Sequence, residues 1–156
     1  MNIYEHLVVL LNEQKKVISI AESCTGGMLA SKIVDVPGSS HIFETGIVTY
    51  SERSKVENLG VNPNVIKHFG VVSFEVACAM ARGLYDKTKS DYAIAVTGYA
   101  GPGNDKEKAP VGTVYFSIED GENNYQYHVH FEGERNQVRE RACEFIVKKL
   151  VELLQK

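Results

Sequence analysis

The 156-residue chain contains 44% hydrophobic and 24% charged residues, and its length suits one domain over residues 1–156 with a substantial core. Its formal charge of −3 and sequence pI near 6.0 provide no basic surface for binding nucleic acid by charge. No apolar run approaches the length of a membrane span, and the first residues lack the pattern of a signal peptide. We therefore expect neither nucleic acid nor a membrane as a partner.

Cysteine usage indicates a reducing compartment. The chain has three cysteines, an odd number without the spacing of a zinc site, so neither a disulfide framework nor a metal site is indicated. Cys78 and Cys143 fall within predicted helices and are expected in the core. These features favour a cytoplasmic protein that uses no metal.

The first elements alternate between helix and strand. Residues 2–16 predict an amphipathic helix, and the β-favouring residues 17–21 predict a strand. A turn over residues 22–27 then leads into a helix over residues 28–34. The expected buried positions of this helix are Leu29, Ala30, Ile33 and Val34.

A second strand and three helices follow. Residues 43–50 have strand composition, and Ser51 is a good cap for a helix over residues 52–59. Residues 65–69 predict a short helix, and residues 74–88 predict a longer amphipathic one. Lys55 lies near the middle of the first of these three helices.

The last third of the chain predicts a buried strand, a hairpin and a helix. The apolar run over residues 91–97 is typical of a central strand, and a glycine-rich loop follows over residues 98–104. Residues 111–119 and 124–131 alternate as two antiparallel strands should. Residues 136–154 predict the final amphipathic helix.

This order of elements predicts three α/β/α layers around a mixed β-sheet. In such folds ligands bind beyond the carboxyl ends of the parallel strands. Residues 25–27, 50–55 and 97–102 all follow predicted strand ends. We therefore expect these three loops to converge on one cleft.

The turn over residues 22–27 admits several interpretations. The start of a helix presents unpaired N–H groups to negative charge, and glycine lets a ligand approach the backbone. The same geometry is able to present a serine or cysteine as a nucleophile, with N–H groups as oxyanion donors. A plain N-terminal cap is the alternative.

Ser23 and Lys55 form the most reactive pair that this arrangement offers. A serine hydroxyl needs a base to remove its proton, and lysine serves only when neutral. Its pKa must then fall from about 10.4 toward 7, which burial beside non-acidic neighbours supplies. Tyr50 is placed to pass or orient the proton through its hydroxyl. A solvated lysine and an aromatic side chain at a sheet edge are the competing interpretations.

Other reactive side chains lack partners in the pattern. Cys24 is a rival nucleophile at a helix start, but the histidines do not sit at strand ends, so we expect it to be buried packing. His128 and His130 share a strand face without a third metal ligand. Arg135 and Arg139 are placed to reach an anionic ligand or to be a solvated helix end.

Six motifs occur in order along the chain: Ala21-Glu-Ser-Cys-Thr-Gly-Gly27, Pro37-Gly-Ser-Ser40, Gly46-Ile-Val-Thr-Tyr-Ser51 with Lys55, Gly70-Val-Val-Ser73, Thr97-Gly-Tyr-Ala-Gly-Pro102 and Pro110-Val-Gly-Thr-Val114. Over residues 5–153 the chain thereby resembles the C-terminal domain of the CinA family. Stand-alone members of that family are nicotinamide-nucleotide amidases, which hydrolyse nicotinamide mononucleotide (NMN) to nicotinate mononucleotide and ammonia.

The resemblance implies roles for individual residues. The family's serine nucleophile falls on Ser23, its lysine base on Lys55 and its assisting tyrosine on Tyr50. It also implies a three-layer fold, a homodimer or higher homo-oligomer, and no metal or other cofactor. The residues expected to bind the substrate are Thr25, Gly26, Gly27, Thr97, Gly98, Ala100, Gly101 and Arg135.

The chain departs from the family pattern at two positions. Tyr99 replaces a usually aliphatic residue, and Ala109 is inserted before Pro110. Many relatives carry a further N-terminal domain that resembles molybdopterin-binding proteins, which we expect to be absent here. Two alternatives stay open: a non-catalytic nucleotide-binding or regulatory module related to competence or damage, and an amidase for another small amide.

Overall fold

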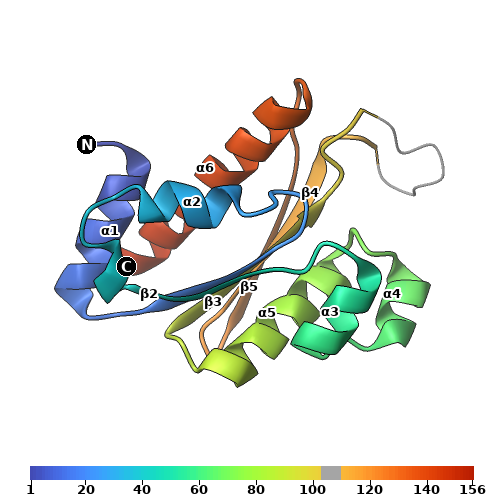
Figure 1. The fold of residues 1–156 in the computed structure, drawn as a ribbon, viewed down its shortest axis with the longest axis horizontal. Coiled ribbons are helices and arrows are strands. Elements are labelled where there is room, and N and C mark those ends of the chain that lie inside the picture. Colours follow the sequence, from blue (N-terminus) through green and yellow to red (C-terminus); the bar gives the residue numbers. More distant parts are fainter. Residues whose placement is uncertain (103–109) are drawn as a thin grey trace.

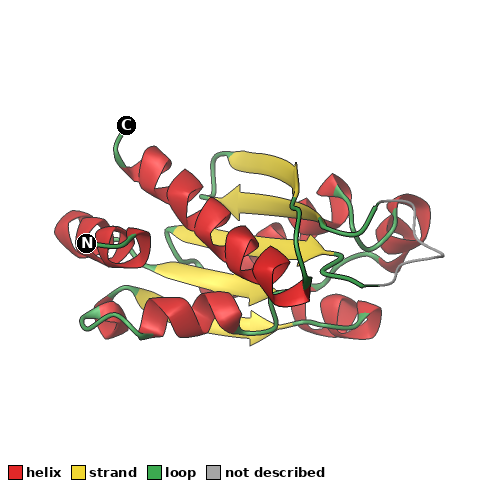
Figure 2. Cartoon of the chain, turned by 90° about the horizontal axis from the view of Figure 1, so that it is seen from above, coloured by secondary structure: helices red, strands yellow, loops and turns green. Residues whose placement is uncertain are grey.

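A mixed five-stranded sheet forms the centre of the part of the chain described by the computed structural model, residues 1–102 and 110–156. Its strand order is β2-β1-β3-β4-β5, and Figure 2 shows the strands lying side by side. The strands are β1 (Ile18–Glu22), β2 (Phe43–Val48), β3 (Tyr92–Gly98), β4 (Thr113–Glu119) and β5 (Asn124–His130). The first three run parallel, and β4 and β5 add an antiparallel hairpin, which confirms the predicted mixed sheet.

Helices cover both faces of this sheet, which gives the predicted three layers (Figure 1). One layer contains α1 (Ile3–Gln14), α2 (Met28–Val34) and α6 (Arg135–Leu154). The other contains α3 (Glu52–Leu59), α4 (Pro63–Phe69) and α5 (Phe74–Thr88). A short 3₁₀ helix, Ser39–His41, leads into β2.

Side-chain size alternates along the two central strands. Ile20 and Ile94 belong to the core beneath α1 and α6, whereas Ala21, Ala93 and Ala95 belong to the core beneath α5. This alternation follows from the two-residue period of a strand. The small side chains on the second face leave room for α5 close to the sheet.

Most element boundaries differ from the sequence prediction by one or two residues. The strand predicted over residues 43–50 ends at Val48, so Tyr50 lies in the following loop. Val34, predicted to be buried, is 58% exposed. Because α2 is short, its buried stripe contains only Leu29 and Ile33. The helices predicted over residues 52–59 and 74–88 are confirmed.

Gly83 lies inside α5, and we expect its replacement by alanine to destabilise the protein. Alanine is normally the better helix former, by about 1 kcal/mol. Here, however, an added Cβ would lie 1.8 Å from the Leu59 carbonyl oxygen. We expect the melting temperature of Gly83→Ala to fall by roughly 3–10 °C. Exposed Lys87→Ala on the same helix is the control, and an unchanged or raised value for Gly83→Ala would contradict the tight contact.

Candidate functional site

The carboxyl ends of the three parallel strands meet at one edge of the sheet, as predicted. The Ser23 N–H, just after β1, donates to the Val96 carbonyl of β3 (3.0 Å), and the Thr49 N–H donates to the Glu22 carbonyl (2.9 Å). A cavity of about 240 Å³ opens at this edge. Its described lining residues are Ser23, Cys24, Tyr50, Val71, Val72, Thr97, Gly98, Tyr99, Ala100, Gly101 and Arg135.

Lys55 is buried beneath this cavity and contacts Ser23 directly. Its side chain is 0% exposed, and its Nζ lies 2.9 Å from Ser23 Oγ. Nζ also donates to the carbonyl oxygens of Thr49 (2.6 Å) and Tyr50 (3.3 Å). Among the described residues no carboxylate forms an ion pair with it. Three oxygens therefore surround the amine without a compensating charge.

Burial lowers the pKa of Lys55 from 10.5 to about 8, although the neighbouring Cys24 and Glu52 side chains oppose the shift. The neutral amine is therefore accessible near physiological pH. The interpretation of Lys55 as a solvated surface lysine is wrong. The sequence held one signal for its burial: Lys55 precedes Leu59 by four residues, and these two side chains form the buried stripe of α3.

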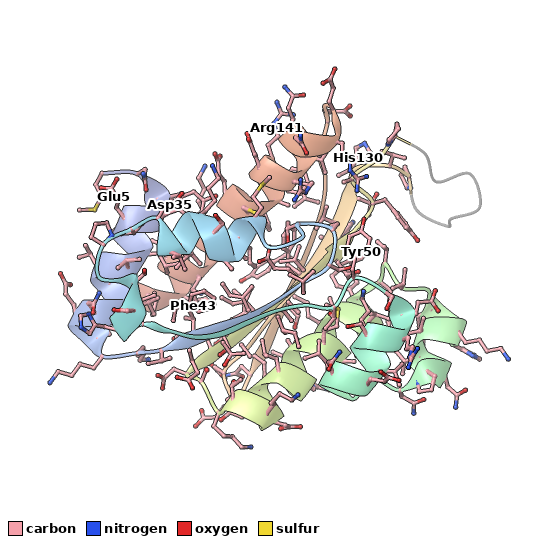
Figure 3. All side chains as sticks on the ribbon, in the orientation of Figure 1. Glu5, Asp35, Phe43, Tyr50, His130 and Arg141 are labelled. Carbon is pink, nitrogen blue, oxygen red and sulfur yellow. The ribbon has the colours of Figure 1, made fainter. Side chains whose placement is uncertain are left out.

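Tyr50 takes a different position from the one expected for a proton relay. Its side chain is 60% exposed at the junction of β2 and α3 (Figure 3). Its hydroxyl accepts a hydrogen bond from Arg135 (3.2 Å), while its backbone carbonyl contacts Lys55. Arg135 also donates to the Gly101 carbonyl. Arg135 thus connects the Tyr50 and Gly101 loops, and the catalytic role of the Tyr50 hydroxyl stays a prediction.

The turn over residues 22–27 is closed by a carboxylate rather than left open for an anion. Glu22 is 1% exposed, and its two carboxylate oxygens accept the N–H groups of Leu29 (2.9 Å) and Ala30 (3.0 Å). Gly26 and Gly27 have φ angles of 55° and 97°, a region that glycine adopts without steric cost. The two N–H groups in the first turn of α2 are therefore not available to a ligand.

Arg139 braces the same turn from α6. Its Nε donates to the Cys24 carbonyl (3.1 Å) and its Nη2 to the Thr25 carbonyl (2.7 Å). The residues that these two hydrogen bonds join are 115 and 114 positions apart in the sequence. This contact was not predicted, because no local spacing relates its partners. The contact of Glu22 was not predicted either, although its partners lie only seven and eight residues further along the chain.

The predicted binding residues fall into two groups. Those that line the cavity are Thr97, Gly98, Ala100, Gly101 and Arg135. Thr25, Gly26 and Gly27 are not among its described lining residues, and the Thr25 side chain is fully buried. A role for these three residues in binding stays a prediction. Tyr99 lines the cavity, whereas Ala109 lies outside the described residues.

Cys24 is buried, as predicted, although it is among the residues that line the cavity. It is 7% exposed, and burial raises the pKa of its thiol to about 12. Cys78 and Cys143 are buried as well.

Among the described residues, no group of three or more His, Cys, Asp or Glu side chains is arranged to hold a metal ion. None of the described helices has the length and apolarity needed to span a membrane.

The three-layer fold and the buried serine–lysine pair beside a cleft define an α/β protein with a site at the carboxyl edge of its sheet. Comparison with known proteins shows the family. Residues 1–154 match the CinA C-terminal domain. The chain belongs to that family.

Individual relatives agree with this assignment. A CinA-like protein from Endomicrobium trichonymphae is 43% identical over 146 residues, which cover 91% of this chain and 34% of that protein. The structure of a competence-damaged protein (CinA) superfamily member from Klebsiella pneumoniae 700603 has a TM-score of 0.95 and 29% identity, covering 99% of both chains. The corresponding Escherichia coli structure has a TM-score of 0.93 and 32% identity, covering 97% of this chain and 88% of that one. This chain spans about a third of the length of the curated relatives it matches.

The lowered pKa of Lys55 predicts a pH-dependent stability. Between about pH 8 and 10.5 the unfolded chain holds a proton on Lys55 that the folded protein does not, so the free energy of unfolding rises with pH. Burial of the charged Lys55 ammonium destabilises the folded protein fully below about pH 8, and this destabilisation is absent above about pH 10.5. Relative to Lys55→Met, the wild type should gain on the order of 3 kcal/mol across the window.

Urea unfolding of both proteins at pH 7.5, 9 and 10.5 would measure this gain. The Lys55→Met variant serves as the reference because all other titrating groups are shared. A constant stability difference between the two proteins would show that Lys55 keeps its ordinary pKa when folded.

Proposed function

We propose that this protein is an amidohydrolase that deamidates NMN to nicotinate mononucleotide and ammonia. Ser23 is the nucleophile and Lys55 its general base. One observation carries the proposal: the buried Lys55 amine lies 2.9 Å from Ser23 Oγ without a carboxylate partner among the described residues. The family resemblance in the motifs around these residues supports the same assignment.

The surroundings of the lysine favour proton transfer from the serine. The carbonyls of Thr49 and Tyr50 accept two hydrogens from Nζ. When Lys55 is neutral, its lone pair is then directed at the Ser23 hydroxyl. The amine accepts the hydroxyl proton as Oγ attacks the carboxamide carbon, so the base is pre-oriented by backbone atoms.

The reaction then proceeds in two halves. Attack of Oγ gives a tetrahedral intermediate, and its collapse expels ammonia, which takes its additional proton from the Lys55 ammonium. This leaves an ester between Ser23 and the nicotinate carbonyl. Water, deprotonated by neutral Lys55, attacks the ester, and the Ser23 oxygen recovers the proton as the carboxylic acid departs and ionises.

The cleft suits a flat heteroaromatic carboxamide that carries an anionic group. Val71, Val72 and Ala100 supply apolar wall. Among the described residues that line the cavity, Arg135 alone carries a full charge. Its present acceptors, Tyr50 Oη and the Gly101 carbonyl, are neutral, so a phosphate would be the stronger partner. We assign the phosphate to Arg135 and oxyanion binding to the N–H groups of Gly98, Ala100 and Gly101, because the Tyr99 N–H donates to the Thr113 carbonyl (3.0 Å).

Ammonia release from NMN by the purified protein tests this proposal. We expect Ser23→Ala and Lys55→Met each to lower kcat by at least about a thousandfold, since the nucleophile and its base act as a unit. Ser31→Ala and Lys67→Met, at exposed positions, are the matched controls and should retain full activity. Folding is checked for each variant by its thermal transition.

Other outcomes separate the alternatives. Activity that survives Ser23→Ala but disappears with Cys24→Ala would make Cys24 the nucleophile. Binding of NMN without turnover would favour a non-catalytic nucleotide-binding module. Faster turnover of nicotinamide, NAD or asparagine than of NMN would indicate an amidase for a different substrate.

The same assignment predicts the pH dependence of catalysis. Only neutral Lys55 serves as a base, and its pKa is about 8, so kcat/KM should rise about tenfold per pH unit below 8 and level off above it. Initial rates at low NMN concentration between pH 6 and 10 would measure the profile. A rate independent of pH between 6.5 and 9 would argue against Lys55 as the base.

A further inference from the structure

We propose that Glu22 and Arg139 are positioning residues that fix the backbone on either side of Ser23 and thereby aim its hydroxyl at Lys55. This inference rests on the proposed function, because it assigns a role in the attack by Ser23. Neither residue is among the described residues that line the cavity. The Glu22 side chain links the residue before Ser23 to the first turn of α2, and the Arg139 side chain binds the two carbonyls after Ser23 as well as Asn136 on its own helix.

Glu22 holds the turn by bridging it to the helix that follows. It is the last residue of β1 and immediately precedes Ser23, yet its side chain reaches the N–H groups of Leu29 and Ala30. Burial of a carboxylate without a cation is unfavourable unless strong donors surround it. Two charge-assisted hydrogen bonds at the positive end of α2 offset that cost. The Glu22 carboxylate therefore links the end of β1 to the start of α2.

Arg139 holds the other end of the turn. It donates to the carbonyls of Cys24 and Thr25, the two residues directly after Ser23. A Cβ added to Gly26 would lie 3.3 Å from Arg139 Nη2, so the guanidinium packs closely against the turn. A lysine in its place has a single ammonium and lacks the planar fork that serves two carbonyls together.

Together these contacts leave Ser23 little freedom. The Ser23 N–H donates to the Val96 carbonyl of β3, and the preceding residue, Glu22, is tied through its side chain to the start of α2. Arg139 holds the carbonyls of the two residues that follow Ser23. A fixed backbone fixes the Cα–Cβ bond of Ser23, and in the rotamer observed Oγ lies 2.9 Å from Lys55 Nζ. A displacement of about 1 Å at a reacting atom is able to lower the rate by about a hundredfold.

Steady-state kinetics on NMN would separate positioning from a merely structural role. Glu22→Gln has nearly the same shape, but its amide offers one acceptor oxygen where two N–H groups need partners. We expect kcat to fall about 10- to 100-fold with KM within about twofold, and the midpoint of the pH profile to stay unchanged. Arg139→Met should lower kcat by a similar factor, and Arg139→Lys should lower it less.

The controls are Glu44→Gln on β2 and Arg141→Met on α6, both exposed.

A second readout does not depend on NMN. A fluorophosphonate probe reacts with an activated serine: the Ser23 Oγ–P bond forms, the P–F bond breaks, fluoride leaves and Lys55 takes the hydroxyl proton. Mass spectrometry gives the labelling rate at Ser23, well below the melting temperature of each variant. We expect labelling to slow at least tenfold in Glu22→Gln and Arg139→Met, and to stay at the wild-type rate in both controls.

The outcomes distinguish the two proposals. If the wild type is labelled but does not consume NMN, the proposed substrate is wrong, and slower labelling of the variants still supports positioning. If both variants label and turn over like the wild type, positioning is wrong while the deamidase assignment stands. A shift of more than one unit in the pH midpoint of Glu22→Gln would show that the Glu22 charge acts on the pKa of the base, and would overturn a purely positioning role. Failure of the wild type to label Ser23 would overturn both the nucleophile and its positioning.

Discussion

The structure of the site depends on one unfavourable burial, that of the Lys55 amine. An ammonium removed from water needs either a carboxylate or several oxygens around it. Here the carbonyls of Thr49 and Tyr50 and the hydroxyl of Ser23 supply the oxygens. Because these acceptors are neutral, burial lowers the pKa of the amine, and the group that is hardest to bury becomes the group best suited to accept a proton.

The charged side chains around the site differ in what they bind: Glu22 and Arg139 bind backbone groups next to Ser23, whereas Arg135 lines the cavity. Glu22 accepts the N–H groups of Leu29 and Ala30, so the positive end of α2 is neutralised by the chain itself. Arg139 donates to the Cys24 and Thr25 carbonyls of the turn. Arg135 lines the cavity, and its acceptors among the described residues, Tyr50 Oη and the Gly101 carbonyl, are neutral. We therefore propose Arg135 as the partner of an anionic ligand, in place of the glycine-rich strand-to-helix turn.

Much of the fold was predictable because it depends on local patterns. The apolar run over residues 91–97 indicated the central strand. The residues at the two ends of α3 were also recognisable, because Ser51 is its N-cap and Gly60 its C-cap in the left-handed conformation. Boundaries were less certain, since the end of a strand is decided by pairing: β2 ends at Val48, where its partner β1 ends at Glu22. Val34 was misassigned because α2 buries only its Leu29 and Ile33 stripe.

By itself the sequence determined the order of helices and strands, the convergence of three loops, and the motifs that relate Ser23, Tyr50 and Lys55 to the CinA family. Hydrophobic periodicity and turn residues reflect interactions between positions close in the chain, so they can be recognised without a structure. Only the tertiary structure decided that Lys55 is buried against Ser23, that the Tyr50 hydroxyl meets Arg135, and that Glu22 and Arg139 close the turn. Those contacts join distant segments, and burial and hydrogen bonding between them depend on how the layers pack.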